Sequence, residues 1–321
     1  MITLKTLLII IAVICTVLLL LYGIGYLFVM ILIKRGQWAK PKPGEAPALL
    51  EPTGKALLAH NIPTFAPFRA LPFEECEIVS GDGLKLRADY LRGAPDTDVT
   101  VIFCHGYKSD TAADFASMYG FYHGLGYNLM YVHMRAHGKS EGKYIGFGAL
   151  DRFDVLLWAK KAAQLFPDTS IFLHGMSMGA ATIMQCADLD MPDAVCGLIS
   201  DCGFSNVNEV FRNLIGGMYH LPATPFVDIF EIVNRKVAGY GFNDADSVRS
   251  LRNSRLPLVY ICGDCDRFVP LDMAMRIYDA CTQEKELLIS EGSGHAASFM
   301  RDNEKYTQLV TGFINRHKRK A

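Results

Sequence analysis

Gly175-Met176-Ser177-Met178-Gly179 is the stretch of sequence that decides the fold. The residues immediately before it form a short apolar run, and those after it are small residues with apolar spacing. A strand, a sharp turn and a helix in this order are the context in which the pattern G-x-S-x-G presents a nucleophilic serine. We expect the serine to have a strained backbone. A Cβ atom at either glycine would collide with the adjoining strand or helix.

Composition limits what the rest of the chain can be. Its 321 residues allow one large α/β domain or two small ones. The net charge of −1 supplies no basic field, so no nucleic-acid partner is expected. Only 20% of the residues are charged and 50% are hydrophobic, an imbalance that the N-terminus explains.

The N-terminal segment predicts a membrane anchor over residues 1–36. The 28 residues from Thr6 to Ile33 include no charged side chain. As a helix they would span about 42 Å, enough to cross a hydrocarbon core of about 30 Å with tilt. Tyr22, Tyr26 and Trp38 lie where aromatic rings suit the membrane interface. A cleaved signal peptide is the alternative, but its apolar region is normally far shorter and no small-x-small cleavage site follows.

The flanking charges predict the orientation of this anchor. Lys5 alone precedes the span, whereas four basic residues follow it, namely Lys34, Arg35, Lys40 and Lys42. The positive-inside rule therefore places the C-terminal domain in the cytoplasm.

The nine cysteines, an odd number, are compatible with that compartment. Cys262 and Cys265 form a C-x-x-C pair, but no second pair stands at zinc-site spacing and no thioredoxin-like pattern surrounds them. We therefore expect no metal and no cofactor.

Residues 37–71 separate the anchor from the domain. Six prolines in this stretch are expected to forbid a long helix and to give a stalk or irregular strap. From residue 72 to 321, apolar strand-like runs alternate with helical patterns, which predicts a mostly parallel sheet covered on both faces. The expected strands are 76–79, 84–91, 99–104, 128–132, 170–174, 195–200, 256–262 and 285–290, and the expected helices 111–125, 150–166, 180–187, 271–280 and 297–316. A long, aromatic and irregular insertion at about 203–250 is expected to form a cap.

A nucleophilic serine needs a base and a carboxylate that orients the base. In a fold of this kind the order along the chain is serine, acid, histidine, each at the C-terminal end of a strand. Asp266 follows the strand 256–262, and His295 follows the strand 285–290. Both the order and the positions fit.

Five motifs in this order carry a resemblance to a known family. They are His105-Gly106, the R-A-H-G-K-S-E-G loop at 135–142, the G-x-S-x-G stretch, G-x-x-D-x-x-V-P at 263–270, and Gly294-His295. Over residues 72–316 the chain resembles serine hydrolases of the α/β-hydrolase superfamily, close to the bacterial serine aminopeptidase-like and lysophospholipase-like branch. The resemblance implies Ser177 as nucleophile, Asp266 as acid and His295 as base.

The same resemblance implies an oxyanion hole made by the backbone N–H groups of Tyr107 and Met178. It also implies a structural role for His105 within the loops. Where relatives often have an aspartate before the 135–142 loop, this chain has His133, which leaves the hydrogen bonds of that loop open.

Several other polar residues compete for a role. Asp264 is an alternative to Asp266 as the partner of His295, or a turn aspartate that bonds its own backbone. Asp201, at a strand end, is expected to anchor a loop, and His174 to pack in the core.

We expect a membrane-anchored hydrolase of a carboxylic ester or thioester, with a small acyl, lipid-derived substrate. The aromatic residues of the cap either line an acyl pocket or form the core of the cap. An aminopeptidase-like amide hydrolase is the main alternative, and a non-catalytic binding protein on the same fold is a weaker one. A peptidase would need an acidic patch for the free amine, and the cap offers Glu209, Asp228, Glu231, Asp244 and Asp246.

Overall fold

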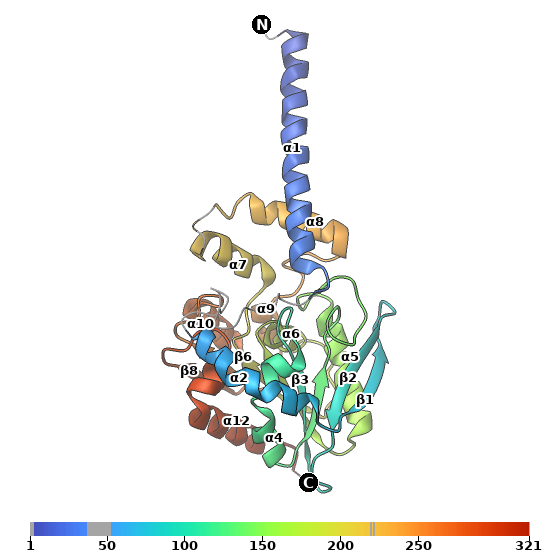
Figure 1. The fold of residues 1–321 in the computed structure, drawn as a ribbon, viewed down its shortest axis with the longest axis vertical. Helices are drawn as coiled ribbons and strands as arrows, with labels where there is room; N and C mark the ends of the chain where they lie inside the picture. Colours follow the sequence, from blue (N-terminus) through green and yellow to red (C-terminus); the bar gives the residue numbers. More distant parts are fainter. Residues whose placement is uncertain (1–2, 37–52, 219, 221, 321) are drawn as a thin grey trace.

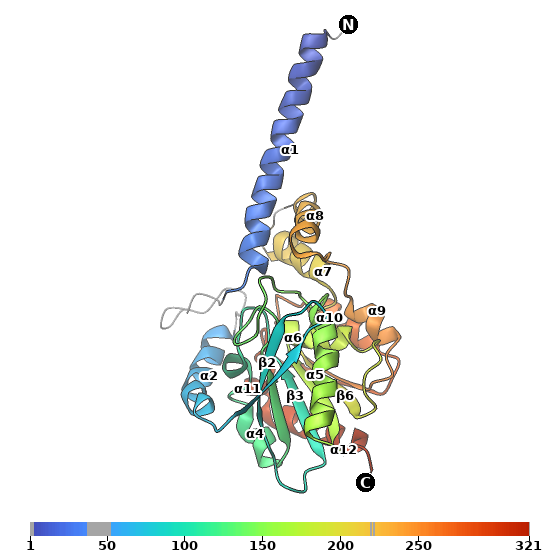
Figure 2. The same ribbon diagram turned by 90° about the vertical axis from the view of Figure 1, so that its right-hand side faces the viewer.

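A computed structural model describes residues 3–36, 53–218, 220 and 222–320. Helix α1 (Leu4–Ile33) projects from an α/β domain, and the C-terminus lies at the opposite end of the molecule (Figures 1 and 2). Trp38, Lys40 and Lys42, which the sequence analysis assigned to the membrane interface and to the basic flank, lie outside the described residues.

The domain is built on an eight-stranded sheet in the order β1-β2-β4-β3-β5-β6-β7-β8. Strand β2 pairs antiparallel with both β1 and β4, and the remaining neighbours are parallel. The predicted mostly parallel sheet is therefore confirmed. The strands are β1 (Glu74–Val79), β2 (Lys85–Leu91), β3 (Val99–Cys104), β4 (Asn128–Val132), β5 (Ser170–Met176), β6 (Val195–Asp201), β7 (Leu258–Gly263) and β8 (Lys285–Ser290).

Helices cover both faces of the sheet because the central strands are buried on both sides. One core cluster joins the sheet to α5 (Asp151–Leu165), α6 (Met178–Gln185), α9 (Ser247–Arg252) and α10 (Leu271–Ala280). The other joins it to α3 (Thr111–Phe115), α4 (Tyr119–Gly124), α11 (Ser298–Arg301) and α12 (Asn303–His317). The helices expected at 111–125 and 297–316 are thus each divided in two.

The expectation that prolines forbid a long helix in the linker is wrong. Helix α2 (Gly54–Arg69) runs for 16 residues and contains Pro63 and Pro67. A proline inside a helix costs about 3 kcal/mol. Tertiary packing offsets that cost, because α2 lies against α3 and buries Phe68. The ring centroids of Phe68 and Tyr131 are 5.1 Å apart.

The cap is more regular than expected. It comprises α7 (Val207–Arg212), a π-helical turn η2 (Asn213–Met218) and α8 (Phe226–Ala238). Helices α7 and α8 lie on the side of the domain from which α1 projects (Figures 1 and 2). The insertion is therefore largely helical rather than irregular.

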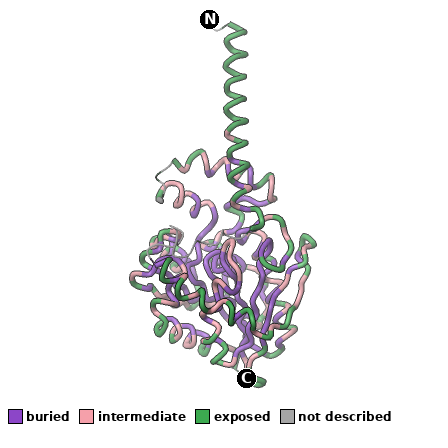
Figure 3. The backbone as a smooth tube through the Cα atoms, in the orientation of Figure 1, coloured by how far each residue is buried: buried purple, intermediate pink, exposed green. Residues whose placement is uncertain are grey.

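Helix α1 divides into an exposed and a docked part. Its N-terminal turns are exposed, and buried residues appear only near its end, where Gly25, Val29 and Ile33 pack at four-residue spacing (Figure 3). A Cβ atom built on Gly25 would lie 2.7 Å from Cγ2 of Ile229 in α8, so the two helices approach closely there. By length and apolar composition α1 can cross a membrane.

Candidate active site

Ser177 occupies the turn between β5 and α6. Its backbone angles are φ 51° and ψ −109°, a strained region for a residue with a side chain. A Cβ atom on Gly175 would lie 2.4 Å from the backbone nitrogen of Ala180, and one on Gly179 would lie 1.8 Å from the carbonyl oxygen of Cys104. Both predictions about this turn, the strain and the need for glycine, are confirmed.

The structure brings Ser177, His295 and Asp266 into one hydrogen-bonded chain. Nε2 of His295 lies 2.8 Å from Oγ of Ser177, and Nδ1 lies 2.7 Å from Oδ2 of Asp266. Oδ1 of Asp266 accepts the backbone N–H groups of Phe268 at 2.8 Å and Val269 at 3.0 Å, which fixes the carboxylate. With the Nδ1 proton held by Asp266, Nε2 faces the serine hydroxyl as an acceptor.

The surroundings of His295 decide its protonation. Burial opposes the charged imidazolium, but the charge of Asp266 and the hydrogen bond to it outweigh burial, so the pKa of His295 is raised above its ordinary value. A raised pKa makes the ring a stronger acceptor for the proton of Ser177.

Neither rival carboxylate is hydrogen-bonded to His295, whose Nδ1 is bonded to Asp266, although the charge of Asp201 is close enough to raise the pKa of the ring. Oδ1 of Asp264 accepts the N–H of Gly292 at 2.6 Å, so Asp264 holds the loop that leads to His295 and does not touch the ring. The carbonyl oxygen of Asp201 accepts the N–H of Ser177 at 2.8 Å, which anchors the serine turn to the end of β6.

The two histidines expected to be structural are both fully buried. His174 lies between the hydroxyl groups of Tyr122 and Tyr306, at 2.8 and 3.0 Å, and burial lowers its pKa to about 3. Nε2 of His105 accepts the N–H of Met134, so its Nδ1 carries the proton and donates to the carbonyl of Gly106. Both expectations are confirmed.

His133, which stands where relatives often have an aspartate, forms hydrogen bonds of its own in this loop. Its Nε2 lies 3.0 Å from Oδ2 of Asp89, and its carbonyl oxygen accepts the hydroxyl of Ser140. Arg135, in the same loop, bonds both carboxylate oxygens of Asp154 at 2.7 and 2.9 Å. The loop is therefore held without an aspartate at position 133.

The two predicted oxyanion donors lie beside Ser177. Met178 is the first residue of α6, so its N–H is one of those that a helix leaves without an intrahelical acceptor. Tyr107 directly follows Gly106, which is close to the serine. A Cβ atom built on Gly106 would lie 3.6 Å from Cβ of Ser177. Both residues therefore flank Ser177, and their role as oxyanion donors is part of the function proposed below.

Two residues that sequence analysis missed hold the loop that carries Tyr107. Oδ2 of Asp114 accepts the N–H of Gly106 at 2.6 Å, and Oδ1 accepts the hydroxyl of Ser109 at 2.6 Å. Burial raises the pKa of Asp114 to about 6. Nε2 of His137 accepts the N–H of Lys108 at 3.0 Å. Asp114 belongs to none of the motifs above. Its bonds to Gly106 and Ser109 depend on how the loop before α3 folds back onto that helix.

An apolar cavity of about 440 Å³ opens onto Ser177. Its volume lies within the range of about 300–1,000 Å³ that is usual for small-molecule sites. Apart from the hydroxyl groups of Ser177 and Tyr107, its wall is aliphatic or aromatic, and it comprises Phe28, Leu32, Tyr107, Phe147, Ser177, Phe204, Val207, Val210, Phe211, Leu214, Ile215, Phe226, Phe230 and Phe268. Four aromatic residues of the insertion, Phe204, Phe211, Phe226 and Phe230, line the cavity, and Tyr240 is buried in the main core cluster.

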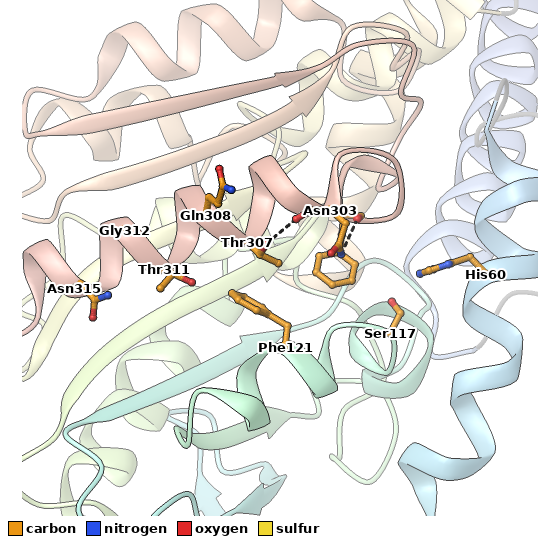
Figure 4. Close-up of a pocket in the computed structure, with 10 residues that line it drawn as sticks. His60, Ser117, Phe121, Asn303, Thr307, Gln308, Thr311, Gly312 and Asn315 are labelled. Atoms are coloured by element: carbon orange, nitrogen blue, oxygen red, sulfur yellow. Dashed lines mark hydrogen bonds between the residues drawn. The ribbon is translucent and has the colours of Figure 1, made fainter.

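A larger cavity of about 920 Å³ lies elsewhere and is a different kind of site. It is an open groove beside α12, whose amide and hydroxyl side chains face Phe121 and Ser117, with His60 of α2 at one end (Figure 4). None of the predicted site residues lines it. Within the described part of the chain, no three His, Cys, Asp or Glu side chains converge as metal ligands would.

Comparisons with solved structures identify the fold. An esterase of Pyrococcus furiosus superposes with a TM-score of 0.63 at 22% identity, over 77% of this chain and 92% of that one. An acylaminoacyl peptidase of Pyrococcus horikoshii gives a TM-score of 0.58 at 20% identity, over 80% of this chain and 43% of that one. The chain has the α/β-hydrolase fold, as the five motifs predicted.

Sequence comparisons narrow the class within that fold. Residues 95–229 match the model of the family described as serine aminopeptidase, S33. An uncharacterized protein of Bacillus subtilis (strain 168), YqkD, is 24% identical over 225 residues, which cover 68% of this chain and 72% of that protein. The matched family supports a serine hydrolase. The match includes Ser177 but ends before Asp266 and His295, whose placement comes from the structure.

Proposed function

We propose that the chain is a membrane-anchored serine hydrolase that cleaves a lipid-derived ester or thioester through an acyl-enzyme. The observation that carries the proposal is the hydrogen-bonded chain from Asp266 through His295 to Ser177 at the floor of an apolar cavity. The domain division at residues 1–36, 37–71 and 72–321 belongs to the same proposal, as does the cap at about 203–250.

The geometry supports a two-step acyl transfer. His295 takes the proton of Ser177 as Oγ attacks the acyl carbonyl, and Asp266 stabilises the imidazolium that forms. The N–H groups of Tyr107 and Met178 stabilise the oxyanion. His295 then returns the proton to the leaving oxygen or sulfur, and water, activated by the same ring, releases the acid and regenerates Ser177.

The cavity favours an acyl chain over a charged group. A peptidase that trims N-terminal residues needs a carboxylate to hold the free amine. Asp228 bonds Arg212, Glu209 bonds Arg276, and Asp244 bonds Arg235. Glu231 and Asp246 bond side-chain amides of their own cap, and none of the five acidic residues lines the cavity. The name of the matched family keeps amide cleavage as the second candidate.

Covalent labelling tests the nucleophile. We expect a fluorophosphonate to modify Ser177 in the full-length protein, with the adduct mapped by mass spectrometry, and His295→Ala to slow the reaction strongly. Labelling at another residue, or none in folded protein, would contradict the proposal.

A substrate panel separates the two candidate activities. p-Nitrophenyl esters, monoacylglycerols, acyl thioesters and aminoacyl amides are compared on the wild type and on Ser177→Ala. Hydrolysis of acyl esters or thioesters that Ser177→Ala abolishes supports the proposal, whereas turnover of aminoacyl amides alone would favour the peptidase.

The proposed orientation places the domain in the cytoplasm, on the basis of the basic residues after α1. A reporter fused to the C-terminus, active only on one side of the membrane, measures this directly. Activity confined to the outer face would reverse the assignment.

A further inference from the structure

We infer that the last two turns of α1 form one wall of the acyl-binding site, and that the acyl chain reaches Ser177 from the bilayer in which α1 is anchored. The inference rests on the proposed function and adds a specificity role for Phe28 and Leu32. A helix that served only as a tether would contribute no side chain to the cavity.

Phe28 and Leu32 lie one turn apart and both line the cavity above Ser177. The ring of Phe28 stacks on that of Phe230 in α8, with centroids 4.2 Å apart and planes inclined by 19°. The cap and the anchor therefore close the apolar cavity together.

Hydrogen bonds fix the end of α1 to the loop beside Ser177. The hydroxyl of Tyr107 donates to the carbonyl of Leu32 at 2.6 Å, and Nζ of Lys108 donates to the carbonyl of Ile31 at 2.6 Å. Both acceptors belong to the last turn of the helix, whose carbonyl groups have no intrahelical donor. The wall that α1 supplies is thus held in register with the loop that carries the predicted oxyanion donor Tyr107.

The apolar surface is continuous from the cavity to the exposed part of α1. The side chain of Phe28 lines the cavity and is nevertheless 36% exposed, so it stands at the rim. The exposed residues on the N-terminal side of Phe28, back to Leu4, are overwhelmingly apolar. The helix from Leu4 to Phe28 is about 36 Å long, close to the hydrocarbon thickness of about 30 Å, so Phe28 lies near the membrane boundary.

This placement favours a bilayer lipid over a water-soluble ester as the source of the acyl chain. A chain that leaves the bilayer next to Phe28 passes between apolar surfaces, and the unfavourable exposure of its methylene groups to water is avoided. An aqueous substrate would gain nothing from an acyl site at the membrane boundary.

The test compares two fluorophosphonates, one with a short and one with a dodecyl chain, on full-length protein in phosphatidylcholine vesicles. For Phe28→Ala and for Leu32→Ala we expect the labelling rate of Ser177 with the dodecyl probe to fall about tenfold, the change that lost pocket contacts typically cause. The rate with the short probe should stay within about twofold. Leu27→Ala is the matched control, because Leu27 is exposed and does not line the cavity.

The source of the chain is tested in the same vesicles. A fluorophosphonate carried on a two-chain phospholipid cannot leave the bilayer during the experiment, and we expect it to label Ser177 of protein in the same vesicles. No labelling by this probe, while the short soluble probe still labels Ser177, would overturn the bilayer route.

The possible failures are distinguishable. Equal chain-length dependence in the wild type, Phe28→Ala and Leu32→Ala, with Ser177 still labelled, overturns the inference and leaves the proposed hydrolase intact. Absence of labelling at Ser177 with either probe overturns the hydrolase itself and the inference with it.

Discussion

The serine turn and the cap around α1 meet at the same cavity but are held by different forces. Around Ser177 the backbone has almost no freedom, because Gly175 and Gly179 touch neighbouring main chain and polar groups are paired at fixed distances. The roof of the cavity presents aromatic and aliphatic side chains such as Phe28 and Phe230, which meet one another by ring packing.

We expect the serine turn to govern the reaction itself and the cavity roof to govern which substrates are accepted. A strained, glycine-bounded turn places Oγ of Ser177 within hydrogen-bonding distance of His295 and tolerates no shift. An apolar roof discriminates among substrates by contact area, so single changes there alter rates modestly and in proportion to chain length. Variants in the two regions should therefore differ in magnitude and in their dependence on the acyl group.

The largest effect is expected for Asp266→Asn. Asparagine cannot hold the Nδ1 proton of His295 as the carboxylate does, so the ring is held in the wrong tautomer and kcat should fall about 10⁴-fold, the loss typical of such triads. Ester hydrolysis by purified protein measures it. Asp264→Asn is the matched control, because its bond to the N–H of Gly292 needs only a carbonyl oxygen. A loss as large in the control would make Asp264 the acid.

Gly179→Ala should cost about 10²-fold or more in kcat, the effect of displacing a reacting group by about 1 Å. The new Cβ atom would meet the carbonyl oxygen of Cys104, which belongs to β3 and cannot move aside. The melting temperature should fall as well. Gly81→Ala, in the turn between β1 and β2, has nothing within 4 Å of its new Cβ atom and should change neither quantity. Full activity in Gly179→Ala would contradict the geometry of the turn.

The pH profile of hydrolysis should fall on its acid side, with a midpoint above about pH 6.5, which is the ordinary pKa of histidine. The neutral ring of His295 is the reactive form and its pKa is raised, so activity is lost as the pH falls through that raised value, by about tenfold per unit below it. Burial raises the pKa of Asp201 to about 7, so this carboxyl titrates in the same window. In Asp201→Asn this fall should persist, at slightly lower pH, and its disappearance would assign it to Asp201.

The serine turn could be predicted from the sequence and the cavity roof could not, because local sterics fix the first and long-range packing forms the second. Ser177, Asp266 and His295 were identifiable because each stands in a local motif at a strand end, and local sterics fix such turns. Phe28 and Leu32 were not, because their place in the cavity depends on a contact between α1 and α8, about 200 residues apart in the chain. Helix α2 was missed for a related reason, since packing of Phe68 overrides the local effect of proline.

The smallest effect is expected for Gly25→Leu, where α1 meets α8. A Cβ atom at this position would already lie 2.7 Å from Cγ2 of Ile229 in α8. The larger leucine side chain would therefore push the two helices apart. Because the contact is between side chains, the domain should keep its melting temperature. Ester hydrolysis with acyl chains of two to sixteen carbons should show a loss of about threefold, confined to the longer chains, since only these reach the wall made by Phe28. Gly23→Leu is the matched control, because a Cβ atom there has nothing within 4 Å. A uniform loss across all chain lengths would instead mean that the docking of α1 acts on the serine turn itself, through the bond from Tyr107 to the carbonyl of Leu32.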